Sequence, residues 1–275
     1  MSATRRGPCP VCNRGPRDTA LAMTTDERGT VSYCHRCGYT HAENLERRPA
    51  APVHPVQQSG PVDWSLTAER IWRRTLPLRG SLAQTYLEYR RCVLPPRDSD
   101  LRYLAPADGH PPTMCARITD SVTGKPISLH FTRLAADGHG KARTDRDKLL
   151  LRGHRKQGGA IRLWPDEAVT HGLAIAEGIE SALAAAHLYV PVWAAIDAGN
   201  LAALPVLVSI ASLVIFADHD AAGIKAAQQC ARRWYQAGRE VRIRCPCTPG
   251  QDAADVSGGS GRSDRFPGGI GERPC

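Results

Sequence analysis

The sequence lacks an export signal and a membrane-spanning segment. No apolar stretch follows its polar, basic start, so no secretory signal is predicted. Its longest apolar run, residues 201–217, is interrupted by Pro205, Ser209 and Ser212, and it is shorter than the roughly 20 residues that cross a bilayer. Buried strands are the better interpretation of that run. We therefore expect a cytoplasmic protein with no membrane partner.

The sequence also lacks a P-loop and any internal repeat. No G-x-x-x-x-G-K-[ST] motif occurs, so we expect no P-loop motor within the chain. Disorder throughout is excluded, because 42% of the residues are apolar and 23% are charged, as in ordinary globular proteins. A length of 275 residues accommodates one large domain or about two to three small ones.

Basic residues are concentrated in the middle of the chain and are few after it. The net charge is +9, which points to a polyanionic partner. Residues 63–165 contain 19 basic and 10 acidic residues, whereas residues 166–256 contain 6 and 10. This division suggests that one part holds phosphates and the other holds cations. Two unrelated solvated surfaces would give the same counts, so charge alone leaves both interpretations open.

Four of the ten cysteines have metal-ligand spacing. Without an export signal, cysteines favour metal binding or free thiols over disulfides. Two C-x-x-C pairs stand 21 residues apart, and each can bring two thiolates to one Zn²⁺: Cys9 and Cys12, then Cys34 and Cys37. A closed shell of four thiolates has no open position. We therefore expect a structural zinc in a ribbon with short strands at 19–23 and 30–33.

The acidic half alternates short apolar runs with helical stretches. This pattern predicts a parallel sheet with helices on its faces. The expected strands are 172–176, 191–196, 213–217 and 240–245, and the expected helices are 179–188, a short one from 200 to 204, and 221–237. In such sheets, ligands bind at the carboxyl ends of the strands.

Carboxylates follow these expected strands. Glu177 follows the first strand and Asp197 the second, Asp218 and Asp220 follow the third, and Asp252 lies in the loop after the fourth. Mg²⁺ prefers such oxygen ligands, so this edge of the sheet is a candidate magnesium site. The alternative is that carboxylates after strands cap the helices that follow.

Three stretches of the acidic half resemble the Toprim domain of bacterial and phage primases and of topoisomerases: residues 176–183, 215–223 and 250–256. The resemblance implies that Glu177, Asp218 and Asp220 are catalytic and hold Mg²⁺ or Mn²⁺, with Asp252 as a further contact. Gln251 departs from the pattern, because a lysine is frequent at its position in this group. The order of parts, zinc ribbon, basic segment and Toprim, is similar to that of primases of phages, plasmids and other mobile elements.

This resemblance gives an expected fold class and domain organisation. We expect an α/β protein in which a parallel-sheet Toprim domain follows a basic α+β polymerase-like segment and a small all-β zinc ribbon. The expected parts are a zinc ribbon at 1–46, a Pro-rich linker at 47–62, the basic segment at 63–165, the Toprim domain at 166–256 and a disordered tail at 257–275.

The basic segment carries the candidate nucleotide and DNA contacts. We expect a positive field for triphosphate and template from Arg117, Arg133, Lys141, Arg143, Lys148 and Arg162. Four aromatic residues either stack on bases or belong to a helix core, and their spacing fits both: Trp64, Trp72, Tyr86 and Tyr89.

The function implied by the resemblance is that of a DNA primase. Such an enzyme synthesises short RNA primers on a single-stranded DNA template from ribonucleoside triphosphates, here beside a separate replicative helicase in the nucleoid. Two alternatives stay open. One is a non-catalytic module that binds single-stranded DNA. The other is a Toprim nuclease or topoisomerase-like enzyme, although 275 residues leave no room for the large tyrosine-bearing domain of a topoisomerase.

Overall fold

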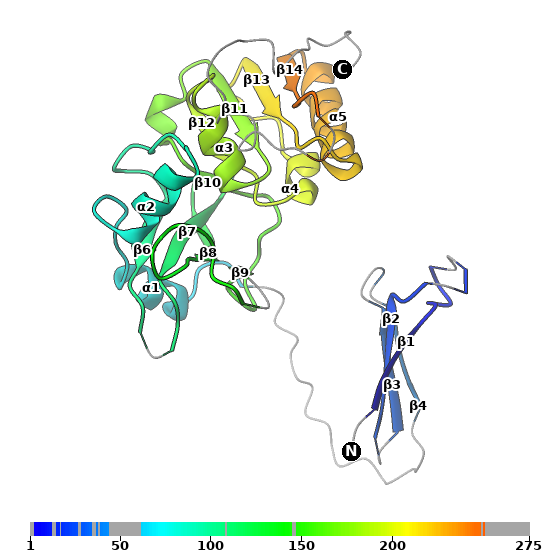
Figure 1. Cartoon of the computed structure of the whole chain (residues 1–275). Helices are drawn as coiled ribbons and strands as arrows, with labels where there is room; N and C mark the ends of the chain where they lie inside the picture. The colour runs from blue at the N-terminus through cyan, green and yellow to red at the C-terminus, as the bar shows by residue number, and fades with distance from the viewer. Residues whose placement is uncertain are drawn as a thin grey trace. The chain divides into compact units, whose positions relative to one another are not determined.

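The computed structural model describes residues 3–12, 15–16, 18–26, 29–34, 37, 39–43, 62–107, 109–144, 147–248 and 250. The chain divides into two compact units, residues 1–58 and residues 59–275 (Figure 1). Of the expected linker only Val62 is described, and the expected tail lies wholly outside the described residues.

The first unit is a small antiparallel sheet of four strands in the order β1-β2-β3-β4 (Figure 1). Its strands are β1 (Ala3–Gly7), β2 (Leu21–Asp26), β3 (Gly29–Cys34) and β4 (Thr40–Glu43). The two ribbon strands expected from the sequence overlap β2 and β3, while β1 and β4 were not expected. Buried Cys9, Leu21 and Cys34 form its small core, so this unit has little apolar packing of its own.

The second unit is built on one sheet of ten strands. Its main path runs β14-β13-β11-β12-β10-β7-β6-β5, and β8 pairs with β7 and β9. The strands are β5 (Leu76–Pro77), β6 (Leu101–Leu104), β7 (Thr113–Asp120), β8 (Pro126–Arg133), β9 (Lys148–Leu150), β10 (Gly159–Arg162), β11 (Gly172–Ala176), β12 (Val192–Ala194), β13 (Ser212–Phe216) and β14 (Glu240–Arg244).

Five α-helices of the described part of the chain pack on this sheet. They are α1 (Leu66–Arg73), α2 (Leu82–Tyr89), α3 (Ile179–Ala185), α4 (Ala198–Ala203) and α5 (Ala221–Gln236), and a 3₁₀ turn covers Asp166–Ala168. Side-chain oxygens accept a hydrogen bond from a backbone N–H in the first turn of four of these helices: Ser65, Ser81, Asp197 and Asp220. These N-caps explain where the helices begin.

The carboxyl half has the parallel sheet that its pattern predicts, with β12, β11, β13 and β14 side by side. Alternate residues of β11, β12 and β13 enter two separate cores. Ala174 and Ala176 face α3, whereas Leu173 and Ile175 join the core that contains α5. Burial on both faces explains the uninterrupted apolar strands. The expected fold class is confirmed: an α/β sheet with a small all-β unit that carries four cysteines before it.

The strand β10 joins the basic and acidic parts into one sheet. It pairs antiparallel with both β7 and β12. A Cβ atom at Gly159 would lie 2.5 Å from Ile118 Cγ2 and 2.9 Å from the Lys156 carbonyl oxygen, so only glycine allows this close pairing. The expected boundary near residue 165 therefore falls at a chain connection within a continuous sheet.

The apolar run at 201–217 is shared between the end of α4, a loop and β13. Among the described residues, no helix combines the length and the apolar character needed to cross a membrane.

Candidate functional site

The four cysteines with metal-ligand spacing come together in the first unit. The Sγ atoms of Cys9, Cys12, Cys34 and Cys37 all lie within 4.8 Å of one another. Cys9 and Cys37 are 3.7 Å apart, and Cys12 and Cys34 are 3.8 Å apart. Four sulfur donors at such separations fit a tetrahedral structural Zn²⁺. Among the described residues, no other group of three or more potential ligands is assembled as closely.

The Toprim-like carboxylates lie at the carboxyl ends of neighbouring parallel strands. Glu177 follows β11, Asp197 follows β12, and Asp218 and Asp220 follow β13. Burial raises the pKa of Glu177, and the negative charges of Asp220 and Asp197 raise it further. The backbone N–H of Ala198 and the ammonium of Lys148 partly offset this rise. The edge of the sheet therefore holds repelling carboxylates, whose repulsion a bound cation would relieve.

Two of these carboxylates also cap helices, as the alternative interpretation predicted. Asp220 Oδ1 accepts a hydrogen bond from the Gly223 backbone at 2.7 Å, and Asp197 Oδ1 accepts one from the Asn200 backbone at 2.9 Å. Asp197 in addition forms an ion pair with Lys156. Because each cap uses one carboxylate oxygen, capping a helix and binding a cation are compatible roles for Asp220.

The loop that follows β14 contacts the residues that follow β13. The backbone N–H of Gly250 donates to the carbonyl oxygen of His219 at 2.8 Å, which fixes the start of the acidic loop beside Asp218 and Asp220. Asp252, the expected further metal contact, lies outside the described residues.

A buried charge network adjoins this edge of the sheet. Glu180, only 5% exposed, accepts a hydrogen bond from the Tyr86 hydroxyl at 2.8 Å. Its carboxylate oxygens lie 3.4 Å from Lys141 Nζ and 3.6 Å from Lys148 Nζ. Burial alone would raise the pKa of Glu180, but the two ammonium groups, a backbone N–H and the Tyr86 hydroxyl together outweigh burial and lower it to about 2. Glu180 is therefore ionised and holds both lysines.

Lys148 connects this network with the Toprim-like carboxylates. A Cβ atom at Gly178 would lie 4.0 Å from Lys148 Nζ and 3.9 Å from Glu180 Oε2. Lys148 thus lies beside the turn that carries Glu177, and its charge also lowers the pKa of Glu177. The role of Glu180 was not expected from the sequence. The sequence feature that could have indicated this role is an acidic residue three positions after Glu177, in the first turn of an apolar helix.

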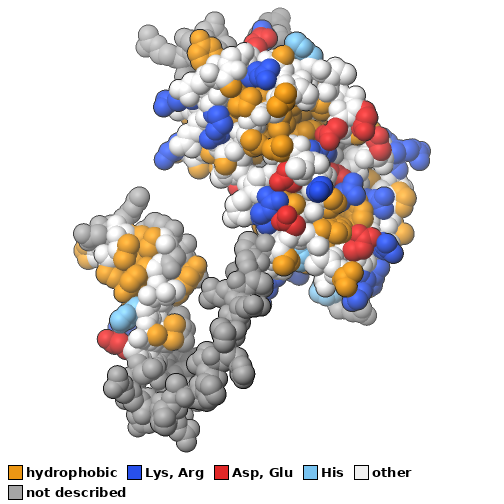
Figure 2. Space-filling model, turned by 180° about the vertical axis from the view of Figure 1, so that it is seen from behind, with side chains coloured by type: hydrophobic (Ala, Val, Ile, Leu, Met, Phe, Trp, Pro, Cys, Tyr) orange, Lys and Arg blue, Asp and Glu red, His pale blue; other side chains and the backbone are white. Residues whose placement is uncertain are grey.

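The six basic residues expected to bind nucleotide or DNA do not form one surface. Arg162 is 7% exposed, and its guanidinium donates to Asp166, Thr119 and two backbone carbonyls. Arg117 pairs with Asp100 at 2.8 Å and covers the ring of Trp72. These two side chains are used within the fold. On the face of the second unit shown in Figure 2, basic side chains are spread out and interleaved with acidic ones.

The remaining four basic residues lie on different parts of the second unit. Lys141 and Lys148 face Glu180, and Arg143 is exposed in the same loop as Lys141. Arg133 lies on β8, next to a cavity described below. Their contacts with nucleotide or DNA stay a prediction.

The aromatic residues are divided between core and surface. Tyr86 is buried against Glu180, and Trp72 is buried beneath Arg102 and Arg117. Trp64 donates its indole N–H to Glu69 at 2.8 Å. The core interpretation therefore holds for these three, whereas Tyr89 is 58% exposed and remains accessible to a base.

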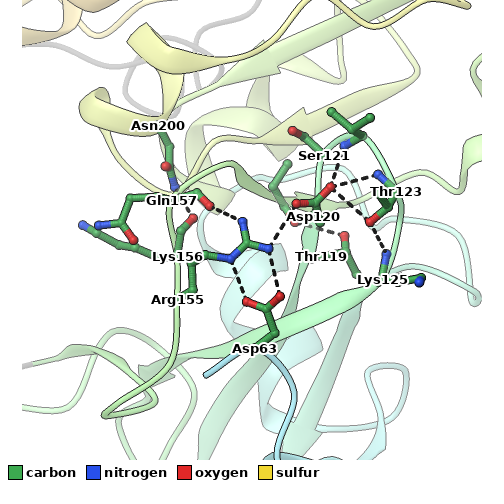
Figure 3. Close-up of polar contacts among 12 residues, drawn as sticks. Asp63, Thr119, Asp120, Ser121, Thr123, Lys125, Arg155, Lys156, Gln157 and Asn200 are labelled. Atoms are coloured by element: carbon green, nitrogen blue, oxygen red, sulfur yellow. Dashed lines mark hydrogen bonds and ion pairs between the residues drawn. The ribbon is translucent and has the colours of Figure 1, made fainter. Parts of the chain in front are cut away.

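The connection between β9 and β10 ties the start of the second unit to the acidic edge (Figure 3). Arg155 donates to both oxygens of Asp63, at 2.7 and 3.2 Å, and to Asp120 at 3.1 Å. The next residue, Lys156, pairs with Asp197, and its carbonyl accepts a hydrogen bond from Asn200 at 2.9 Å. This loop thus balances the charge of Asp197 at the edge of the sheet.

Family models match two parts of the chain. One, a domain of unknown function (DUF7146), matches residues 64–163, and the other, the Toprim domain, matches residues 172–263. The chain therefore carries a Toprim domain, as its resemblance predicted. No curated protein matches the chain.

Several primase structures are among the solved structures similar to the chain. The primase fragment of the bacteriophage T7 primase-helicase is 16% identical, with a TM-score of 0.42 over 91% of this chain and 92% of the fragment. The zinc-binding and RNA polymerase domains of the Aquifex aeolicus primase are 16% identical, with a TM-score of 0.45 over 92% and 74%. A primase domain from Pseudomonas aeruginosa is 16% identical, with a TM-score of 0.40 over 74% of this chain, which spans 62% of that domain's length.

Proposed function

We propose that this Toprim-containing chain is a DNA primase. It would synthesise short RNA primers on single-stranded DNA by Mg²⁺-dependent nucleotidyl transfer, in the replication of a phage, a plasmid or an integrated element. The proposal goes beyond the presence of a Toprim domain, because it assigns a reaction, a template and three catalytic residues.

The position of Glu177, Asp218 and Asp220 after the paired parallel strands β11 and β13 carries this proposal. The residues lie within the stretch that matches the Toprim model. Burial raises the pKa of Glu177, and the neighbouring charges of Asp220 and Asp197 raise it further. Carboxylate oxygens are the donors that Mg²⁺ takes in nucleotidyl-transfer sites, so the residues present fit that ion.

Bound Mg²⁺ would stabilise charge that develops on the α-phosphate and on the leaving pyrophosphate. The chain's own residues would perform the remaining tasks. A raised pKa makes Glu177 a stronger base, suited to accept the proton of the attacking 3′-hydroxyl. Lys148, held by Glu180 beside the turn of Glu177, would bind the triphosphate, with Lys141 next to it.

The first unit would support template binding. Its four cysteines fit a structural zinc, and Arg5 and Arg6 on β1 are exposed near them in sequence, available for phosphate contact. Unwinding of the duplex would come from a separate replicative helicase, since the sequence contains no P-loop.

The proposal is tested by incubating the full chain with single-stranded DNA, labelled ribonucleotides and Mg²⁺. We expect short RNA from the native chain and none from Asp218→Asn. The matched control is Asp98→Asn, which removes an exposed carboxylate outside the Toprim match and should leave synthesis unchanged. Nicked DNA without RNA would favour the nuclease alternative, and binding without either product would favour a non-catalytic module. Either result would overturn the proposal.

A further inference from the structure

A cavity of about 380 Å³ lies between α1 and the strands β6 to β9. Its walls are largely apolar, with Ile71 from α1, Leu104 from β6, Phe131 from β8 and Leu149 from β9. Arg74 at the end of α1, Arg133 on β8 and exposed His110 add positive or polar groups to the lining. The volume is in the range of small-molecule sites.

The strand register places this cavity on the face of the sheet opposite the buried charge network. Phe131 is paired with Cys115 and Leu149, and Arg133 is paired with Thr113. The intervening Thr132 is paired with Lys148, the residue that contacts Glu180. Successive residues of a strand point to opposite faces. The cavity is therefore separated by the sheet from Glu180, Lys148 and the Toprim carboxylates beyond them.

The positive charge at the cavity is not balanced within the described part of the chain. Arg74 and Arg133 have no carboxylate partner there, and no Asp or Glu belongs to the described residues that line the cavity. Other arginines of the same region, Arg117 and Arg155, are paired with carboxylates. Two guanidinium groups at the wall of an apolar cavity favour an anionic ligand, and Arg binds phosphate in particular.

We propose that this cavity binds one nucleotide, with its phosphate at Arg74 and Arg133 and its base in the apolar part against Phe131. A nucleotide combines the two chemistries that the lining requires: a flat, weakly polar ring and a phosphate. Phe131 is half-buried and lines the cavity, where its aromatic ring suits stacking of a base. The site is independent of the proposed primer synthesis, because it lies across the sheet and no described residue that lines it is a carboxylate able to hold a metal.

The nucleotide can come from two sources, a free mononucleotide or one unit of a single strand, and the test separates them. Binding of labelled AMP and ATP to the full chain is measured by equilibrium dialysis in buffer without added divalent cations, so that the Mg²⁺-dependent site is silent. Binding of a short oligo(dT) and of an abasic oligonucleotide of the same length is measured in parallel. Adenosine and inorganic phosphate serve as the two half-ligands.

Two kinds of variant probe the cavity. Arg74→Met with Arg133→Met removes both charges and keeps most of the side-chain volume, while Ala105→Trp fills the cavity from an exposed lining position and keeps the charges. The matched control is Arg70→Met, which removes an exposed arginine of the same helix that does not line the cavity.

If the source is a free nucleotide, we expect AMP or ATP to bind at least tenfold more weakly to both cavity variants than to the native chain. If the source is a single strand, we expect the same loss for the normal oligonucleotide and no such loss for the abasic one. Arg70→Met should bind as the native chain does, and each half-ligand should bind more weakly than the whole nucleotide. Loss with mononucleotides identifies a free nucleotide as the source, and loss with the oligonucleotide alone identifies the strand. Equal binding by native and cavity variants, or binding of phosphate as tight as that of AMP, would overturn the proposal.

Discussion

Asp220 is both a helix cap and a proposed catalytic residue, and two substitutions separate these roles. Asn is as good an N-cap as Asp, so Asp220→Asn keeps the bond to the Gly223 backbone and removes only the charge. Asp220→Ala removes both, and loss of such a cap costs about 1 kcal/mol. We expect both variants to lose primer synthesis, and only the Ala variant to have a lower Tm.

The comparison is made by thermal melting without divalent cations and by primer synthesis with Mg²⁺. The Tm of Asp220→Asn should equal or exceed that of the native chain, because one of the charges that repel Glu177 has been removed. Primer synthesis by Asp220→Asn would show that this carboxylate serves only to cap α5.

Glu180 stabilises the fold through its ionised form, and this contribution depends on pH. Its pKa falls from an ordinary 4.5 to about 2. The stabilisation is therefore complete above pH 4.5 and is lost as the pH falls toward 2. Removing one partner of a buried ion pair is strongly destabilising, although here both lysines retain partial access to solvent. We expect Glu180→Gln to lower the free energy of unfolding by about 2–3 kcal/mol at pH 7.

Denaturant unfolding of native chain and variant from pH 7 to pH 3 checks this expectation. The difference between them should shrink as the pH falls below 4.5. Glu167→Gln is the matched control, because Glu167 is exposed and should show little difference at any pH. A difference that does not change with pH would mean that Glu180 acts through packing alone.

Among the elements, the four-stranded unit depends most on a metal. Its buried core contains Leu21 and two of the four cysteines, too little apolar surface to hold a sheet of this size. Metal binding is then part of its folding free energy. We expect Cys9→Ser with Cys34→Ser to abolish zinc binding and unfold strands β1 to β4, while the Tm of the second unit stays unchanged.

Metal analysis of chain purified without chelators, with hydrogen exchange of both units, measures these effects. Cys115→Ser is a control at a buried thiol of the second unit, and it should leave the zinc content at one ion per chain. Absence of zinc from the native chain, or protection of β1 to β4 in the double variant, would contradict the prediction.

Local pattern predicted the elements of the carboxyl half well, because β11, β12 and β13 are apolar on both faces and two of the three helices there, α4 and α5, begin at a side-chain cap. The expected strand at 172–176 coincides with β11, and the expected helix at 221–237 coincides with α5 to within one residue. Short edge strands such as β5 and β9 have too few residues to show an apolar pattern in the sequence. The sequence also predicted that Glu177, Asp218 and Asp220 lie at the carboxyl edge of the sheet, because each of them comes after an expected strand.

Contacts between distant parts of the chain could not be predicted in this way. Tyr86 and Glu180 are 94 residues apart, and the pairing of β10 with β12 depends on the whole sheet. The burial of Arg162 among backbone carbonyls and the opposite faces of Arg133 and Lys148 likewise follow from strand register. The counts of charged residues predicted one positive surface for these residues, whereas in the folded chain each of them has different surroundings.

For the whole molecule, the net charge of +9 predicts that binding of single-stranded DNA weakens as salt rises. Each phosphate neutralised by Lys or Arg releases counterions, so log K should fall linearly with log salt, by about 0.7 per contact on a single strand. Several basic residues of the middle segment are already paired with carboxylates, among them Lys141, Arg155 and Arg117. The slope should therefore report far fewer contacts than the 19 basic residues of the middle segment suggest.

Arg143 tests this reasoning, because it is exposed in the loop of Lys141 and forms no ion pair with another described residue. Arg143→Ala should weaken binding and reduce the salt slope by about 0.7 if it contacts one phosphate. Arg232→Ala removes an equally exposed charge from α5 in the acidic half, and it should change neither quantity. Fluorescence anisotropy of a labelled oligonucleotide between 50 and 200 mM salt, roughly the range in which the response is steep, gives both values. A flat salt response of the native chain, or equal losses in the two variants, would mean that DNA does not bind through the middle segment.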